Sequence, residues 1–155
     1  MEIRQFKTGD EAALLGVFRS AIHQIASRNY SLEQVQAWAP LETTVEEFAT
    51  RLRENKPFVA VLGLEPVGFA DLQTDGYIDQ FYVSGLLGRR GIGRQLMDRI
   101  EAEAKHLGIK ELYSHVSLTA EPFFASRGFY VEERRRPVLR GVTFDNALMR
   151  KSLLR

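Results

Sequence analysis

The chain has 155 residues, a formal net charge of +1 and no cysteine. A chain of this length fits one domain with an ordinary buried core, and its near-neutral charge disfavours a dedicated nucleic-acid-binding protein. The lack of cysteine excludes disulfides, thiolate nucleophiles and cysteine-ligated metals. The three histidines have no metal-ligand spacing on one helix face, so we expect no metal.

The sequence carries no signal for a membrane or for export. Its first ten residues include charged side chains, the first at position 2. The longest apolar run, 58–64, is far shorter than the ~20 residues that a spanning helix needs. We therefore expect a cytoplasmic protein with no membrane partner.

The first third of the chain predicts one strand followed by three helices. Alternation over 2–6 favours a strand, and apolar periodicity over 12–25 favours a helix. Capping boxes mark the three helix starts: Thr8 with Glu11, Ser31 with Gln34, and either Thr43 with Glu46 or Thr44 with Glu47. Pro40 is expected to end the second helix.

From residue 58 the period changes to that of strands. Segments 58–63 and 67–72 predict a hairpin that turns at Glu65-Pro66, and 77–83 predicts a further strand. The remaining segments predict a long helix closed by Gly108, a strand, a short helix stopped by Gly128 and two strands, over 92–107, 112–116, 119–127, 129–138 and 142–149. This order predicts an α+β (mixed α/β) fold in a single domain, 1–155.

The long helix begins within the stretch GLLGRRGIGRQLM, residues 85–97. No Ser, Thr, Asp or Asn caps it, and Arg89, Arg90 and Arg94 add positive charge to the positive end of the helix dipole. The first four N–H groups of a helix lack internal partners. Bare N–H groups beside cations predict a phosphate site; the alternative is a poorly capped, solvated helix whose glycines pack on the sheet.

Two common phosphate loops do not fit this stretch. A dinucleotide fingerprint needs a third glycine, where the sequence has Leu96, and it falls in the first strand-to-helix turn. A P-loop needs Lys followed by Ser or Thr, where the sequence has Arg94-Gln95.

The stretch does resemble the pyrophosphate loop of the GNAT superfamily of acyl-CoA-dependent N-acetyltransferases. Gly91-Ile92-Gly93 match its Gly-x-Gly/Ala, and Phe81-Tyr82-Val83 resemble the strand that leads into it. Gly88 stands where the family has Gln or Arg, so Arg89 or Arg90 would supply the charge. The resemblance implies acetyl-CoA as co-substrate, its pyrophosphate held by residues 88–94, and a mostly antiparallel twisted sheet of about seven strands with helices on both faces.

A second stretch, 117–129, resembles the family's Asn-x-x-Ala-x-x-x-Tyr-x-x-x-Gly-Phe in spacing. Ser117 replaces the Asn, and Phe124 replaces the Tyr that often protonates the departing thiolate. The runs Ala26-Ser27, Tyr30-Ser31, Ala37-Trp38-Ala39, Thr119-Ala120 and Pro122-Phe123-Phe124 resemble the bacterial YafP-type members more narrowly.

The resemblance implies direct attack of an amine on the thioester in a ternary complex, with backbone N–H groups around 81–83 stabilising the oxyanion. Asp79 is our candidate base, because alternation places it on the same face as Phe81 and burial would raise its pKa. The alternative is an exposed carboxylate. Ser117 or water would protonate the thiolate, although a strand-end Ser more often caps a turn. We expect Tyr113 and His115 to be packed or solvated.

For the acceptor amine we expect Tyr30 and Trp38 to line the site, the alternative being a place in the core. The basic residues Arg134, Arg135, Arg136 and Arg140 form either a solvated face or a site for an acidic acceptor or the ribose phosphate. The acceptor is a small molecule or a protein amine, and a homodimer is left open. A competing hypothesis, motivated by Phe124, is a non-catalytic acyl-CoA sensor.

Overall fold

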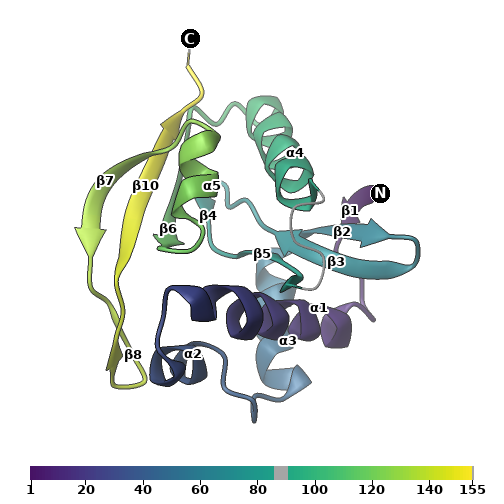
Figure 1. Cartoon of the computed structure of the whole chain (residues 1–155). Coiled ribbons are helices and arrows are strands. Elements are labelled where there is room, and N and C mark those ends of the chain that lie inside the picture. The colour runs from purple at the N-terminus through teal and green to yellow at the C-terminus, as the bar shows by residue number, and fades with distance from the viewer. Residues whose placement is uncertain (86–90, 155) are drawn as a thin grey trace.

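The structure is a computed structural model that describes residues 1–85 and 91–154 (Figure 1). The helical segments are α1 (Glu11–Ser20), the π-helical η1 (Ala21–Ile25), the 3₁₀-helical η2 (Ala26–Arg28), α2 (Leu32–Trp38), α3 (Val45–Asn55), α4 (Ile92–His106) and α5 (Glu121–Ser126). The strands are β1 (Glu2–Gln5), β2 (Phe58–Leu62), β3 (Glu65–Ala70), β4 (Tyr77–Ile78), β5 (Phe81–Val83), β6 (Glu111–Ser117), β7 (Tyr130–Arg135), β8 (Val138–Leu139), β9 (Val142–Thr143) and β10 (Asn146–Ser152).

The strands form two four-stranded sheets, ordered β1-β2-β3-β5 and β4-β6-β10-β7, and a small β8-β9 ribbon. Every pairing is antiparallel except β4 with β6. The predicted mostly antiparallel α+β fold is confirmed. The described residues contain more strands than the seven expected, because 77–83 divides into β4 and β5 and the last two strands are each interrupted.

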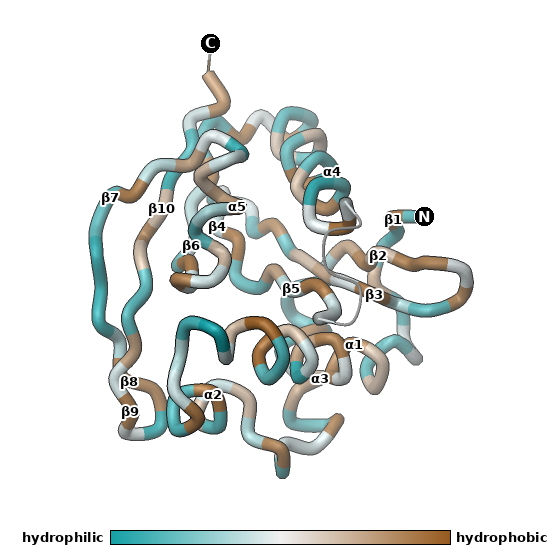
Figure 2. Tube along the Cα trace, viewed as in Figure 1, coloured by the Kyte–Doolittle hydropathy of each residue, from teal (hydrophilic) through white to brown (hydrophobic). Residues whose placement is uncertain are grey.

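Helices cover both faces of the first sheet, as expected. Successive residues of β2 alternate between two cores: Phe58 and Ala60 pack in one cluster with α4, and Val59 and Val61 in another with α1 and α3. Figure 1 shows α4 and α5 on one side of the strands and α1, α2 and α3 on the other. In Figure 2, β7 at the sheet edge is mostly hydrophilic, and such charge discourages pairing with another chain.

The break between β4 and β5 is caused by Asp71, which follows β3 of the preceding hairpin. Its fully buried carboxylate accepts hydrogen bonds from the backbone N–H of Asp79 at 2.9 Å and of Gln80 at 2.8 Å. These two N–H groups thus find partners without a neighbouring strand. β4 can therefore stay with β6 while β5 turns away to join β3, which parts the two sheets.

The helix starts agree with the predictions in two cases of three. Ser31 and Gln34 form a complete capping box, and Thr44, rather than Thr43, caps α3 through Glu47 N–H. The Thr8 prediction is wrong: Asp10 precedes α1, and its carboxylate is taken by Arg4 and by the Lys7 N–H.

Two further boundaries differ from the predictions. The hairpin turns at 63–64, so Glu65 and Pro66 belong to β3. The helix expected over 12–25 ends its α-helical part at Ser20 and continues as the π-helical η1. Within the described residues, none of the helices has the length and hydropathy to span a bilayer.

Candidate active site

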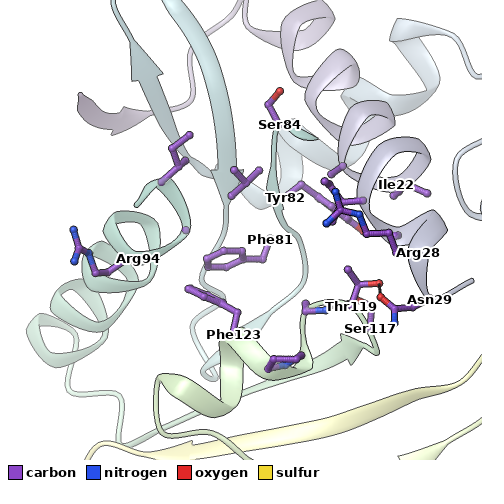
Figure 3. Close-up of a pocket in the computed structure, with 18 of the residues that line it drawn as sticks. Ile22, Arg28, Asn29, Phe81, Tyr82, Ser84, Arg94, Ser117, Thr119 and Phe123 are labelled. Atoms are coloured by element: carbon purple, nitrogen blue, oxygen red, sulfur yellow. Dashed lines mark hydrogen bonds between the residues drawn. The ribbon is translucent and has the colours of Figure 1, made fainter. Parts of the chain in front are cut away.

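A cleft of about 650 Å³ opens where β5 parts from β6 (Figure 3). One wall, which we call the coenzyme wall, consists of residues 81–84 of β5 and its end and residues 91–94 at the start of α4. The opposite wall, which we call the acceptor wall, consists of residues from 21–29, Trp38, Ser117 and Thr119. The cleft is also lined by Ala120, Pro122 and Phe123.

The start of α4 lies bare on the coenzyme wall. Gly91 is the N-cap residue in the left-handed region, at φ 74°, and no side chain of the described residues caps the helix. The guanidinium of Arg94 lies beside the turn, 3.3 Å from where a Cβ on Gly91 would be. The expected uncapped helix start is therefore present over 91–94. The predicted contributions of Gly88, Arg89 and Arg90 lie outside the described residues.

Gly93 keeps the approach to this helix start narrow but open. A Cβ at Gly93 would lie 3.3 Å from the ring of Phe123 and 3.8 Å from that of Phe81. A larger side chain there would fill the space between α4 and the two rings. The glycine therefore leaves room for a ligand chain next to the N–H groups of the helix.

The edge of β5 supplies further backbone groups to the cleft. Among the described residues β5 pairs only with β3, and the N–H of Ser84 donates to the carbonyl of Val67 at 2.8 Å. Because successive N–H groups of a strand point in opposite directions, the N–H of Val83 points away from β3, toward the cleft. The predicted residues Phe81, Tyr82 and Val83 all line it.

The predicted electrostatics of Asp79 are wrong. Its carboxylate accepts two hydrogen bonds from Arg51, at 2.6 and 2.5 Å, and one from Asn55 at 2.7 Å. Burial alone would raise the pKa of Asp79, but Arg51 and Asn55 outweigh it and hold that pKa below its ordinary value. Asp79 is therefore an anion at neutral pH and a weak base. The carboxyl whose pKa burial does raise is Asp71.

A small cavity of about 50 Å³ adjoins the cleft. Trp38 and Tyr82 line both, and Asp79 and His115 line the small cavity. Desolvation lowers the pKa of His115, and the charge of Arg135 lowers it further against the opposing charge of Asp79. The imidazole is thus neutral at pH 7. The cavity is large enough for a water molecule between these polar groups.

Ser117 and Phe124 line this same cavity. The Ser117 hydroxyl accepts a hydrogen bond from the N–H of Ala120 at 3.1 Å, which is the turn-capping alternative, and its own proton is left to donate. Phe124 is buried and packs edge-on against Phe81 and Phe129. The position that resembles the family's Tyr therefore holds a core ring with no proton to give.

The two aromatic residues predicted for the acceptor differ in position. Trp38 lines both the cleft and the small cavity, and its indole N–H donates to the hydroxyl of Tyr82 at 3.3 Å. Tyr30 lines neither. Its buried hydroxyl donates to the carbonyl of Asp145 and accepts from the N–H of Leu118, so it ties the start of β10 to the end of β6.

The basic residues of the last hairpin have partners within the protein, and three of the four partners are carboxylates. Arg134 pairs with Glu121, Arg135 with Glu133 and Arg136 with Asp145, and Arg140 donates to the carbonyl of Ala37. These residues therefore do not form a free cationic surface.

Two features of the site were not found from the sequence: Arg28 was not singled out, and the π-helical turn at 21–25 was expected as α-helix. His115 was expected to be packed or solvated, and it is exposed and packs edge-on against Tyr77. A π-helical turn is rare and frequent at functional sites, and here Ala21, Ile22 and Ile25 all line the cleft. Asp79 and His115 line one cavity because β4 pairs with β6, with Ile78 opposite Ser114, and no local pattern records that pairing.

Comparison with known proteins identifies the class of this fold and site. Residues 26–151 match the family model described as an acetyltransferase (GNAT) domain. The chain therefore belongs to the GNAT acetyltransferase family, and as in that family its co-substrate is acetyl-CoA.

Within the family, the chain is 32% identical over 97% of its length, and 95% of the relative's, to the uncharacterized N-acetyltransferase YafP of Escherichia coli K12. The crystal structure of a GCN5-related N-acetyltransferase from Rhodopseudomonas palustris superposes with a TM-score of 0.93 at 34% identity, over 98% of this chain and 95% of that one. The PaiA N-acetyltransferase of Thermoplasma acidophilum in complex with coenzyme A shares the fold, with a TM-score of 0.75 at 21% identity over 97% and 98% of the chains.

Proposed function

We propose that residues 1–155 act as one N-acetyltransferase domain that transfers the acetyl group of acetyl-CoA to an amine by direct attack in a ternary complex. The observation that carries the proposal is the uncapped start of α4 opening into the cleft beside the free edge of β5. The PaiA relative named above was crystallised with coenzyme A on the same fold.

The coenzyme wall binds through its main chain. The N–H groups at 91–94 and the guanidinium of Arg94 hold the diphosphate, because an uncapped helix start and a cation both favour an anion. The cleft-facing N–H of Val83 donates to the carbonyl oxygen of the thioester and stabilises the charge that develops on it. Gly88, Arg89 and Arg90 complete this site in the proposal.

Residues that line the small cavity accept the proton that the attacking amine loses. Asp79, an anion at neutral pH, attracts the positive charge that forms on the attacking nitrogen. His115 then accepts the proton through the water that the cavity can hold, since its pKa lies closer to neutral than that of Asp79.

Nitrogen forms a bond to the acetyl carbon, the carbon–sulfur bond breaks, and the thiolate leaves. A thiol pKa of about 8–9 makes the thiolate a tolerable leaving group. Water, or the free hydroxyl proton of Ser117, then protonates it.

Coenzyme binding tests the first half of this proposal. Acetyl-CoA is expected to raise the melting temperature of the wild-type protein. Replacing both glycines of the helix start, Gly91→Val with Gly93→Leu, is expected to abolish that rise. Gly16→Ala, in α1 where a Cβ meets nothing within 4 Å, is the matched control and should keep it. A wild-type protein that shows no shift with millimolar acetyl-CoA would contradict the assignment.

A non-catalytic acyl-CoA sensor is the second candidate, favoured by the buried phenyl ring of Phe124. It shares the coenzyme site, so binding does not separate the two. Release of free thiol from acetyl-CoA in the presence of amines does: turnover with any amine rules out a pure sensor.

A further inference from the structure

The cleft contains two cations and, among the residues described as lining it, no carboxylate. The cations are Arg94 and Arg28, and Figure 3 shows them on opposite sides of Phe81. Arg94 lies at the helix start, where the proposed function uses it for the diphosphate. Arg28 lies on the acceptor wall and has no part in that scheme.

Arg28 is held at the cleft by unusual backbone geometry. The chain continues from α1 through the π-helical η1 into the 3₁₀-helical η2, whose last residue is Arg28. Buried Ala26 anchors η2 to the core around Ile22. The side chain of Arg28 is exposed, and it has no ion-pair or hydrogen-bond partner within 1–85 and 91–154.

Arg94 shares this lack of a partner among the described residues, but the other arginines near the acceptor wall are all bonded. Arg51 holds Asp79, Arg134 holds Glu121, and Arg140 holds a backbone carbonyl. The hairpin cluster that the sequence offered for an acidic acceptor is thus satisfied internally. Arg28 is the cation of the acceptor wall. Its five N–H donors have no acceptor among the described residues.

A second donor lies next to Arg28. The hydroxyl of Thr119 donates to Oδ1 of Asn29 at 2.9 Å, which fixes the Asn29 amide. Its Nδ2 is then oriented away from Thr119, with both hydrogens available. A guanidinium beside an amide NH₂ suits a planar carboxylate, which accepts from both.

The part of this wall that η1 and η2 supply beside Arg28 and Asn29 is apolar, and Ile22, Ile25 and Ala26 line it. We propose that the acceptor is an amine that also carries a carboxylate, such as a free amino acid with an apolar side chain. Arg28 and Asn29 bind its carboxylate, and its amine points toward Asp79 and His115. This inference rests on the proposed acetyltransferase function and names the acceptor class for the same cleft.

The test uses matched amines and thiol release from acetyl-CoA. The probes are L-phenylalanine, L-leucine and L-methionine, each compared with its amide and with the amine that lacks the carboxylate. The wild-type enzyme is expected to prefer the amino acid by about 10- to 100-fold in kcat/KM, since hydrogen bonds to charged groups have that effect.

Arg28→Ala should abolish this preference and raise the KM for the amino acid while leaving the KM for acetyl-CoA unchanged. Arg28→Glu should favour the amine that lacks the carboxylate. Arg53→Ala is the matched control, because Arg53 is an exposed arginine on α3, away from the cleft, paired with Glu11 and Glu46; the preference should stay intact.

Three outcomes overturn the proposal. The first is equal turnover of the three members of each set, and the second is turnover of none of the amino acids. The third is that Arg28→Ala raises the KM for acetyl-CoA rather than the KM for the amino acid. The last would assign Arg28 to a coenzyme phosphate. The melting temperature and thiol release with other amines separate these failures from failure of the proposed function. If acetyl-CoA still raises the melting temperature and an amine outside these sets is turned over, only the acceptor class is wrong. If acetyl-CoA gives no shift, or no amine is turned over, the proposed function is wrong as well.

Discussion

The two walls of the cleft use different parts of the chain. The coenzyme wall presents backbone N–H groups at the start of α4 and along β5, and its glycines keep them accessible. The acceptor wall and the small cavity present side chains: Arg28, Asn29, Trp38, Asp79 and His115. Backbone groups tolerate changes of sequence, whereas side chains do not, so under the proposed function the first wall suits a shared coenzyme and the second sets the acceptor.

The largest effect should come from His115 on the side-chain wall. His115→Gln is expected to lower kcat about 10²- to 10⁴-fold, the usual contribution of a general base. In the wild type, kcat should rise with pH through the lowered pKa of His115 as the imidazole loses its proton, and then level off. A pH–rate profile of both proteins measures this. If the variant retains the same rise, His115 is not the base.

Asp71 links the two walls, since it holds the point where β5 leaves β4. Asp71→Ala leaves one buried and one part-buried N–H group unpaired and should cost about 2–6 kcal/mol in free energy of unfolding, at about 1–3 kcal/mol each. Asp71→Asn keeps one oxygen and should cost less. Asp98→Ala, which removes an exposed ion pair with Arg127, is the control and should cost at most about 1 kcal/mol. Urea unfolding measures all three; equal losses for Asp71→Ala and the control would contradict this role.

Asp79→Asn tests whether the two walls act separately, because it should change catalysis without changing coenzyme binding. We expect kcat to fall roughly tenfold while acetyl-CoA raises the melting temperature as in the wild type. Because the folded-state pKa of Asp79 is lowered, the stability it contributes is present above its unfolded pKa and is lost as pH falls through the folded value.

The stability difference between wild type and Asp79→Asn, from urea unfolding, should therefore be full at pH 7 and vanish in strong acid. A difference that grows toward acid would show the opposite sign of linkage. An unchanged kcat would remove Asp79 from the mechanism.

Ser117→Ala should have the smallest effect. It removes the hydrogen bond to the Ala120 N–H, which should cost about 1 kcal/mol in stability. It should also lower kcat less than tenfold, because water can protonate the thiolate. Stopped assays of thiol release measure the loss of kcat, and thermal melts measure the loss of stability. A larger fall in kcat would assign the leaving-group proton to Ser117.

Several elements followed from local sequence alone. The Ser31 and Thr44 caps, the closure of α4 at Gly108 and the uncapped helix start at Gly91 all lie where the pattern indicated. Each depends on interactions within a few residues: a side chain that caps a helix, a glycine at positive φ, or apolar residues at helical spacing. These features sufficed to predict the α+β fold, whereas the resemblance to the acetyltransferase family came from the motif matches at 81–83, 91–93 and 117–129.

Other features were decided only by the tertiary structure. The pKa of Asp79 depends on Arg51, which comes from a separate helix, and the cation cluster of the last hairpin is neutralised by Glu121 and Asp145 across the fold. The strand expected over 77–83 divides because Asp71 from the preceding hairpin binds its backbone. Charge and strand pairing depend on distances between segments far apart in the chain, and local periodicity carries no information about those distances.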